Sequence, residues 1–186
     1  MPSLASVTKA AGVALLALLP ALLWADDYAA RVENVEVLNV DDGYELNAHI
    51  VYVLSPTAKA AIYKGVPLSW KLLVKVQREG LLWNRTLYQQ QLPFVIQHQA
   101  LLNQYMVKNL SDDRVEMFAS LKLALAYMGS IRLPLMGLRR SDGHDYRLAI
   151  KIQFDREFLP VPLRPESYFD SQWDLSSDWF IWHLQK

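Results

Sequence analysis

The chain has 186 residues, of which 52% are hydrophobic, and its 19 Lys and Arg residues balance its 19 Asp and Glu residues. That apolar share is sufficient for one hydrophobic core, and it excludes disorder of the whole chain. Because the net charge is zero, the sequence carries no general attraction for nucleic acid, and we expect no nucleic-acid partner.

Residues 1–25 have the layout of a secretory signal peptide, in which Lys9 is the only charge before an apolar run at residues 10–24. This run is shorter than the ~20 residues that a helix needs to cross a bilayer. We therefore expect cleavage after Ala25 and a single β-rich periplasmic domain at residues 26–186, with an uncleaved membrane anchor as the alternative. The absence of cysteine excludes disulfides and thiol chemistry.

The first predicted elements are strands at residues 32–39 and 46–54, and in the second strand apolar side chains recur at every other position. A short helix follows. Its N-cap is Ser55, its first residue is Pro56, and Gly65 suits a left-handed C-cap. The alternating pattern then predicts three more strands, at residues 70–77, 82–97 and 101–109.

A second short helix is predicted from its N-cap Ser120 to Gly129, and the clearest strand pattern of the chain comes after it at residues 146–154. Three prolines at residues 159–165 predict an extended connection to a last strand at residues 177–184. The order of elements therefore predicts a mainly β fold, an antiparallel β-sandwich-like single domain with two short α-helices.

The sequence contains no catalytic or metal-binding motif. Its four histidines are scattered, and the Gly-x-Ser-x-Gly pattern of a serine nucleophile is absent. Asp174 and Asp178 lie near tryptophans and suggest a sugar hydrolase, but a role as loop or capping acids is the favoured interpretation. We expect a protein that is not an enzyme and that uses no cofactor and no metal.

Basic side chains recur on the solvent faces of the predicted strands. Lys71 and Lys75 share one strand face, and Arg139 and Arg140 lie near the hairpin that precedes the strand carrying Arg147 and Lys151. Such a stripe could meet anionic lipid head groups or an acidic partner. Lysine and arginine are also ordinary on solvated strand faces, and this second interpretation is favoured, so we expect at most weak surface contact with a membrane.

The C-terminal tail is rich in tryptophan. In the predicted last strand, Trp179 and Ile181 face one side while Phe180 and Trp182 face the other, which predicts a closing strand buried on both faces. Trp173 lies outside this strand and is the tryptophan that we expect to be available to a ligand. The candidate partner or ligand contacts are Trp173, Arg139, Arg140, Lys71 and Lys75.

Four stretches in this order resemble a known family: residues 65–68, 98–107, 118–129, and 154–165 followed by Trp173, Trp179 and Trp182. With these stretches, the chain resembles domain of unknown function (DUF) family 4390, small exported proteins of proteobacteria. The resemblance implies no catalytic residues. It does suggest a partner in envelope signalling, namely a membrane-bound sensor histidine kinase of the nitrogen-regulation type.

Three functions are compatible with these observations. The first is a periplasmic binding or interaction module, accessory to an inner-membrane signalling protein, and this is the function that we expect. The second is a β-sandwich that binds cell-envelope sugars or lipids through aromatic side chains. The third, a hydrolase with an unrecognised acid pair, has the least support.

Overall fold

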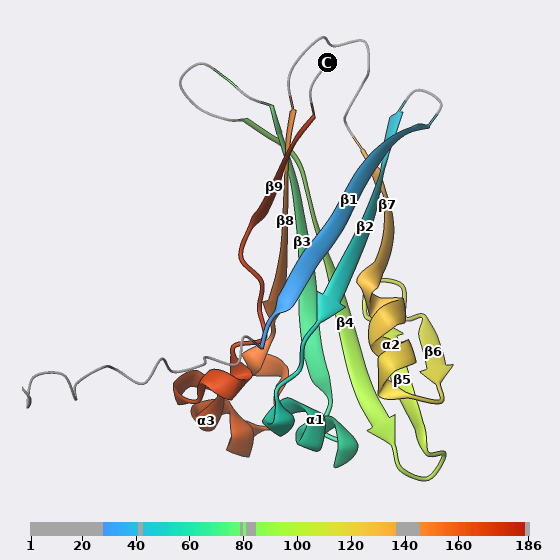
Figure 1. Cartoon of the computed structure of the whole chain (residues 1–186), viewed down its shortest axis with the longest axis vertical. Coiled ribbons are helices and arrows are strands. Elements are labelled where there is room, and N and C mark those ends of the chain that lie inside the picture. The colour runs from blue at the N-terminus through green and yellow to red at the C-terminus, as the bar shows by residue number, and fades with distance from the viewer. Residues whose placement is uncertain (1–27, 41–42, 79, 81–84, 137–145, 185–186) are drawn as a thin grey trace, which may run out of the picture.

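The computed structural model describes residues 28–40, 43–78, 80, 85–136 and 146–184, which form two antiparallel β-sheets packed against each other (Figure 1). The smaller sheet has the strand order β1-β2-β7, with β1 at Ala30–Val40, β2 at Gly43–Tyr52 and β7 at Ser130–Leu135. The larger sheet has the order β6-β5-β4-β3-β8-β9. Its strands are β3 (Leu68–Arg78), β4 (Arg85–Gln99), β5 (Gln104–Asn109), β6 (Val115–Phe118), β8 (Tyr146–Phe154) and β9 (Phe180–Leu184). The predicted mainly β, sandwich-like fold is confirmed, and the predicted leader lies outside the described residues.

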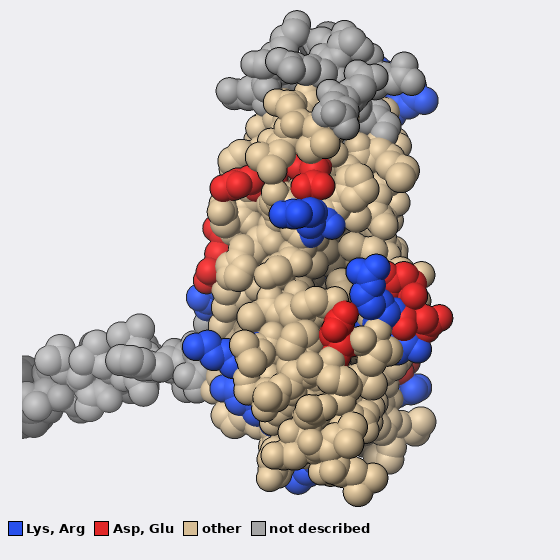
Figure 2. All heavy atoms as spheres, turned by 90° about the vertical axis from the view of Figure 1, so that its right-hand side faces the viewer, with Lys and Arg blue, Asp and Glu red and all other residues tan. Residues whose placement is uncertain are grey.

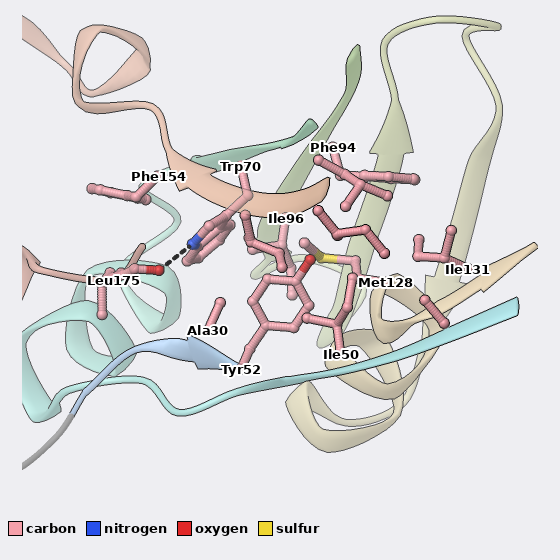
Figure 3. Packing of buried hydrophobic residues seen from close by; sticks show 14 of the residues in the cluster. Ala30, Ile50, Tyr52, Trp70, Phe94, Ile96, Met128, Ile131, Phe154 and Leu175 are labelled. Atoms are coloured by element: carbon pink, nitrogen blue, oxygen red, sulfur yellow. Dashed lines mark hydrogen bonds between the residues drawn. The ribbon is translucent and has the colours of Figure 1, made fainter. Parts of the chain in front are cut away.

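The core lies between the sheets and is built from the alternating apolar positions of their strands. At its centre, Trp70 of β3 is fully buried. The ring of Tyr52 meets it edge-on, with the centroids 5.5 Å apart, and the ring of Phe154 lies 5.1 Å away on the neighbouring strand (Figure 3). Residues from both sheets and from the connection after β8 therefore share one core.

The two predicted helices are present, with the predicted N-caps. Ser55 precedes α1 (Pro56–Tyr63), and its hydroxyl accepts a hydrogen bond from the backbone N–H of Ala58 at 3.0 Å. Ser120 precedes α2 (Leu121–Gly129) and caps the N–H of Leu123 in the same way. Gly65 follows α1 with a φ of 83°, the left-handed conformation in which glycine is favoured.

The connection predicted to be extended at residues 159–165 is instead helical. Three short 3-10 turns, at Arg156–Phe158, Val161–Leu163 and Ser171–Trp173, flank a third helix, α3 (Arg164–Phe169). Proline is tolerated here because Pro162 and Pro165 stand in the first turns, where no backbone N–H is needed. The prediction of two helices was therefore one short.

The last strand, β9, is an edge strand rather than a strand buried on both faces. It pairs with β8 alone, and Trp179 and Trp182 each keep 39% of their surface exposed. The apolar residues on its two sides have different neighbours, because Phe180 and Leu184 pack against the core while Trp179 lies beneath Lys75 and Lys151 on the outer face. The prediction of a fully buried closing strand was wrong.

The two long sides of the sandwich are closed differently. On one side, α2 packs against β2, β5 and β6 and fills the space between the sheets (Figure 1). On the other side, β1 contacts β8 and β9 directly, and no described helix lies between them. None of the described helices is long and apolar enough to cross a membrane.

Candidate functional site

Trp173 is not available to a ligand. Only 1% of its surface is exposed, and its ring stacks on Phe154 with the centroids 5.9 Å apart and the planes 18° apart. The expectation that it is available to a ligand was wrong, because the 3-10 turn at Ser171–Trp173 places it in the core. No alternating pattern marks a residue in such a turn as buried.

Of the four basic candidates, the structure places two. Arg139 and Arg140 lie outside the described residues. Lys71 and Lys75 lie on the outer face of the larger sheet, as predicted. The ammonium group of Lys71 pairs with the carboxylate of Asp155 at 2.7 Å, whereas Lys75 lies over the ring of Trp179, with its Nζ 4.8 Å from the centroid.

Two serines position Trp179. The hydroxyl of Ser177 accepts a hydrogen bond from the backbone N–H of Ile152 at 2.9 Å, and that of Ser176 accepts one from Phe154 at 2.9 Å. The N–H of Ser177 in turn donates to the carbonyl of Ile152 at 2.8 Å. The backbone N–H and C=O groups at this edge of β8 thus have hydrogen-bond partners in the segment that precedes β9. These hydrogen bonds fix Ser176 and Ser177 against β8 and thereby position Trp179.

Trp179 lies on the outer face of the sheet beneath two lysines. Ile181 pairs with Ala149, which shares the outer face of β8 with Lys151, so Ile181 lies on the outer face too. Trp179 is two residues before Ile181 and therefore points to the same side. Besides Lys75, Lys151 of β8 approaches the ring, with its Nζ 5.9 Å from the centroid. Cations over an exposed aromatic face are attracted by ~0.5–1 kcal/mol each. We call Trp179, Lys75 and Lys151 the Trp179 platform.

Two hollows meet at this platform. On the outer face of the sheet, a hollow of about 310 Å³ is lined by Lys75, Gln77, Arg147, Ala149, Trp179 and Ile181. At the open side of the sandwich, a larger hollow of about 770 Å³ lies between residues 28–32 and residues 171–180. Lys151 and Trp179 line it too. Trp179 lines both hollows.

The larger hollow lies between the start of β1 and the segment that leads into β9. In the described part of the chain β1 pairs only with β2, and β9 pairs only with β8. Each of them therefore has one edge that no described strand pairs with, although β1 comes close to β8 and β9 on this side. An extended segment of another chain could pair there and place its side chains in the hollow.

The charge around the platform is mainly positive. Within the described structure, neither Lys75 nor Lys151 forms an ion pair, and Arg147 lines the smaller hollow together with Lys75. Of the two carboxylates lining the larger hollow, Asp174 is paired with Arg156, so Asp178 is the one left to offset the lysines. Such a surface favours an anionic ligand.

The site has no evident nucleophile. The hydroxyl of Ser177 is engaged twice, since it accepts from Ile152 and donates to the carbonyl of Asp178 at 2.8 Å. The described residues contain no group of three or more His, Cys, Asp or Glu side chains that could hold a metal ion. The arrangement is suited to binding by charge, stacking and backbone pairing.

A further hollow, of about 540 Å³, lies on the outer face of the smaller sheet. Its polar lining comes from all three strands and includes Asn34, Glu36, His49 and Arg132. Arg132 also pairs with Glu45, with 3.5 Å between Nε and Oε1. Because acidic and basic groups offset one another here, this surface lacks the single sign of charge that the Trp179 platform has.

Sequence reasoning identified the lysines of the site but not its aromatic member. The strand pattern placed Lys75 and Lys151 on outer faces, where they are found. Trp179 was expected to be buried, because a pattern within one strand does not reveal that the strand lies at the edge of a sheet. Its spacing of two from Ile181 was the one available indication that it shares a face with the lysines.

The chain matches one family model, described as domain of unknown function (DUF4390), over residues 28–183. The match begins before β1 and ends within β9, so it spans the described sandwich except for the last residue of β9. No curated protein and no solved structure is significantly similar to the chain.

Proposed function

Since this chain belongs to the DUF4390 family, whose description assigns no activity, we propose its function from the geometry of the site. The protein is a non-enzymatic binding module that takes up an acidic, extended segment of a partner protein at the Trp179 platform. The observation that carries this proposal is an exposed tryptophan under two lysines that lack an ion pair within the described structure, next to two open strand edges.

The place of action and the partner are part of the proposal. The apolar run at residues 10–24, preceded by Lys9, supports export to the periplasm. The partner is an inner-membrane signalling protein with an acidic periplasmic segment, such as a sensor histidine kinase. Opposite charges would speed the encounter, and strand addition would determine the register of the segment.

A peptide of alternating glutamate and valine is a direct probe of the platform, because it is acidic and prefers an extended conformation. Peptide binding is measured by fluorescence anisotropy against a peptide of alternating glutamine and valine. We expect tight, salt-sensitive binding of the acidic peptide only. Trp179→Ala should weaken it by more than ~30-fold, the loss typical of an interface tryptophan that carries much of the binding energy.

Trp182→Ala is the matched control, since Trp182 lies in the same tail and is equally exposed, 39%, but belongs to the other face. This variant should bind the acidic peptide as the wild type does. Equal losses in the two variants, or equal binding of the acidic and neutral peptides, would refute the assignment to the platform.

In cells, the partner can be identified by replacing Ile181 with a photo-crosslinking amino acid. Ile181 lies beside Trp179 in the smaller hollow, whereas Leu38 is exposed on the smaller sheet and serves as the control position. We expect capture of an inner-membrane signalling protein from Ile181 and not from Leu38. Recovery of the same proteins from both positions would count against the proposal.

A second candidate function, binding of envelope sugars or lipids, is favoured by one observation. The exposed ring of Trp179 borders a hollow of about 770 Å³ with both polar and apolar walls, and sugar rings stack on such aromatic faces. Soluble cell-wall saccharides in the same anisotropy assay, as competitors of the acidic peptide, distinguish the two. Displacement of the peptide by saccharide at low salt would favour this second function.

A further inference from the structure

Exposed leucines lie at the end of the sandwich that carries α1, away from Leu184 at the end of β9. The turn between β4 and β5, residues 100–103, projects from this end (Figure 1). Leu101 is fully exposed there, and Leu102 is 64% exposed. Backbone hydrogen bonds from Leu102 to Gln99 and from Asn103 to Ala100 define the turn. The leucines are therefore directed outward by a formed turn, although their exposure to water is unfavourable.

The end of α1 lies next to this turn. The carbonyl of Tyr63 is 3.1 Å from Nδ1 of His98, near the end of β4, and the rings of Tyr63 and His98 are stacked with their centroids 5.3 Å apart. The side-chain amide of Gln97 donates to the carbonyl of Gly65 at 2.8 Å. Tyr63 itself is 69% exposed. An amphipathic ring thus lies beside the leucine turn.

The charged side chains of the α1 region have one sign. Lys59 and Lys64 of the α1 region are both exposed, and Lys59 shares a helix face with Tyr63 by its spacing of four. From Leu46 to Ser111 the sequence has five lysines and two arginines against a single acid, Glu79. The lowest part of the surface in Figure 2 is almost wholly uncharged and shows a basic group but no acidic one.

The position where the N-terminal residues join the domain also indicates that this end faces a bilayer. β1 begins at the end of the sandwich that carries α1 and α3 (Figure 1), so the residues before Tyr28 join the domain there. Those residues include the apolar run at residues 10–24. In the alternative in which this run is kept as a membrane anchor, the bilayer would lie nearer to this end than to the other.

We propose that the β4–β5 turn and the end of α1 insert into the surface of an anionic bilayer. Leu101 and Leu102 enter the acyl region, Tyr63 lies at the head-group level, and Lys59 and Lys64 meet anionic head groups. A convex tip of two side chains buries far less than the ~800 Å² per partner of a stable protein interface, whereas a fluid bilayer can close around it. This inference does not depend on the Trp179 platform.

Because the chain has no cysteine, Leu101→Cys provides a single attachment site for an environment-sensitive fluorophore in the full chain. Vesicles of phosphatidylglycerol and phosphatidylcholine in equal parts should shift its emission to the blue, and nitroxide-labelled lipid should quench it. Vesicles of phosphatidylcholine alone should give a much smaller change. A label that stays in water with both kinds of vesicle overturns the proposal, and a protein partner would then be the occupant of this end.

Phe169→Cys is the matched control. Phe169 is 92% exposed at the end of α3, but its chain neighbours Glu166 and Asp170 are acidic. The label there should remain in water, and an equal shift at both positions would show general adhesion and refute the assignment to the turn. Adding Lys59→Gln and Lys64→Gln to Leu101→Cys should reduce the vesicle partition constant by about fivefold per lysine. An unchanged partition constant would contradict the head-group contact.

Discussion

The indole nitrogen of Trp70 donates a hydrogen bond to the backbone carbonyl of Leu175, 3.1 Å away and 105 residues later in the chain (Figure 3). Trp70 also contacts the ring of Phe154, and Phe154 stacks on Trp173. The connection between β8 and β9 is therefore part of the core. Because this segment is anchored in the core, it fixes the position of Trp179 and of the start of β9.

Truncation of the two tryptophans of this region should lower the stability by very different amounts. Trp173→Ala removes a buried ring and should lower the free energy of unfolding by ~3–5 kcal/mol. Trp179→Ala removes a 39% exposed ring and should cost less than about 1 kcal/mol. Urea unfolding followed by far-UV circular dichroism measures both. A larger loss from Trp179→Ala than from Trp173→Ala would contradict the burial described here.

Gly129 is required where α2 meets β2. A Cβ atom on Gly129 would lie 2.0 Å from the carbonyl oxygen of Ile50, which is backbone and cannot move without disturbing the smaller sheet. Gly129→Ala should therefore destabilise the protein by at least ~2 kcal/mol, although alanine favours helices more than glycine does.

Gly43→Ala is the control for this substitution, since the nearest atom to its Cβ would be the carbonyl oxygen of Val40 at 3.8 Å, an ordinary contact. Thermal unfolding of the two variants should separate them by several degrees, because ~1 kcal/mol shifts the midpoint by ~2–4 °C or more at this chain length. Equal midpoints would show that α2 can move away from β2.

Ser177 replaces a backbone partner at the edge of β8. Ser177→Ala leaves the buried N–H of Ile152 without its acceptor at 2.9 Å and should cost ~1–3 kcal/mol. Amide hydrogen exchange should show faster exchange at Ile152, with Val74 in the next strand little affected. If protection at Ile152 is unchanged, another group accepts this bond and Ser177 does not position the tail.

Tyr52 should make stability depend on pH under alkaline conditions. Burial raises the pKa of its hydroxyl above the ordinary value of 10.0, because the core disfavours the phenolate. Stability from the neutral phenol is fully present below pH 10, and as the pH rises above that value the unfolded chain loses its proton first. The free energy of unfolding should then fall by up to about 1.4 kcal/mol per pH unit from this group.

Tyr52→Phe removes this titration and keeps the ring beside Trp70. Guanidinium unfolding between pH 9 and pH 11 compares the two proteins, with the range chosen to bracket the ordinary tyrosine pKa. The variant should lose less stability over this range than the wild type. Parallel losses would mean that Tyr52 reaches solvent before the protein unfolds.

Residue patterns along the chain determined the strands and the caps. Alternation of apolar residues depends only on the two-residue period of a strand, so β8 was predicted with its observed bounds. Ser55 and Ser120 cap their helices as expected, because the capping bond closes within three residues. Strands β6 and β7 were missed for different reasons. β6 has only four residues, and β7 alternates fully but contains Pro134, which disfavours a strand unless it lies at a sheet edge, as β7 does.

The tertiary structure alone decided which tryptophan is buried and which lies on a surface. The burial of Trp173 comes from its contact with Phe154, and the exposure of Trp179 comes from the place of β9 at the edge of its sheet. Both depend on pairing between segments that are distant in sequence, whereas local patterns report only which face of an element is apolar. The sequence thus determined the lysines of the platform, and strand order brought Trp179 beneath them.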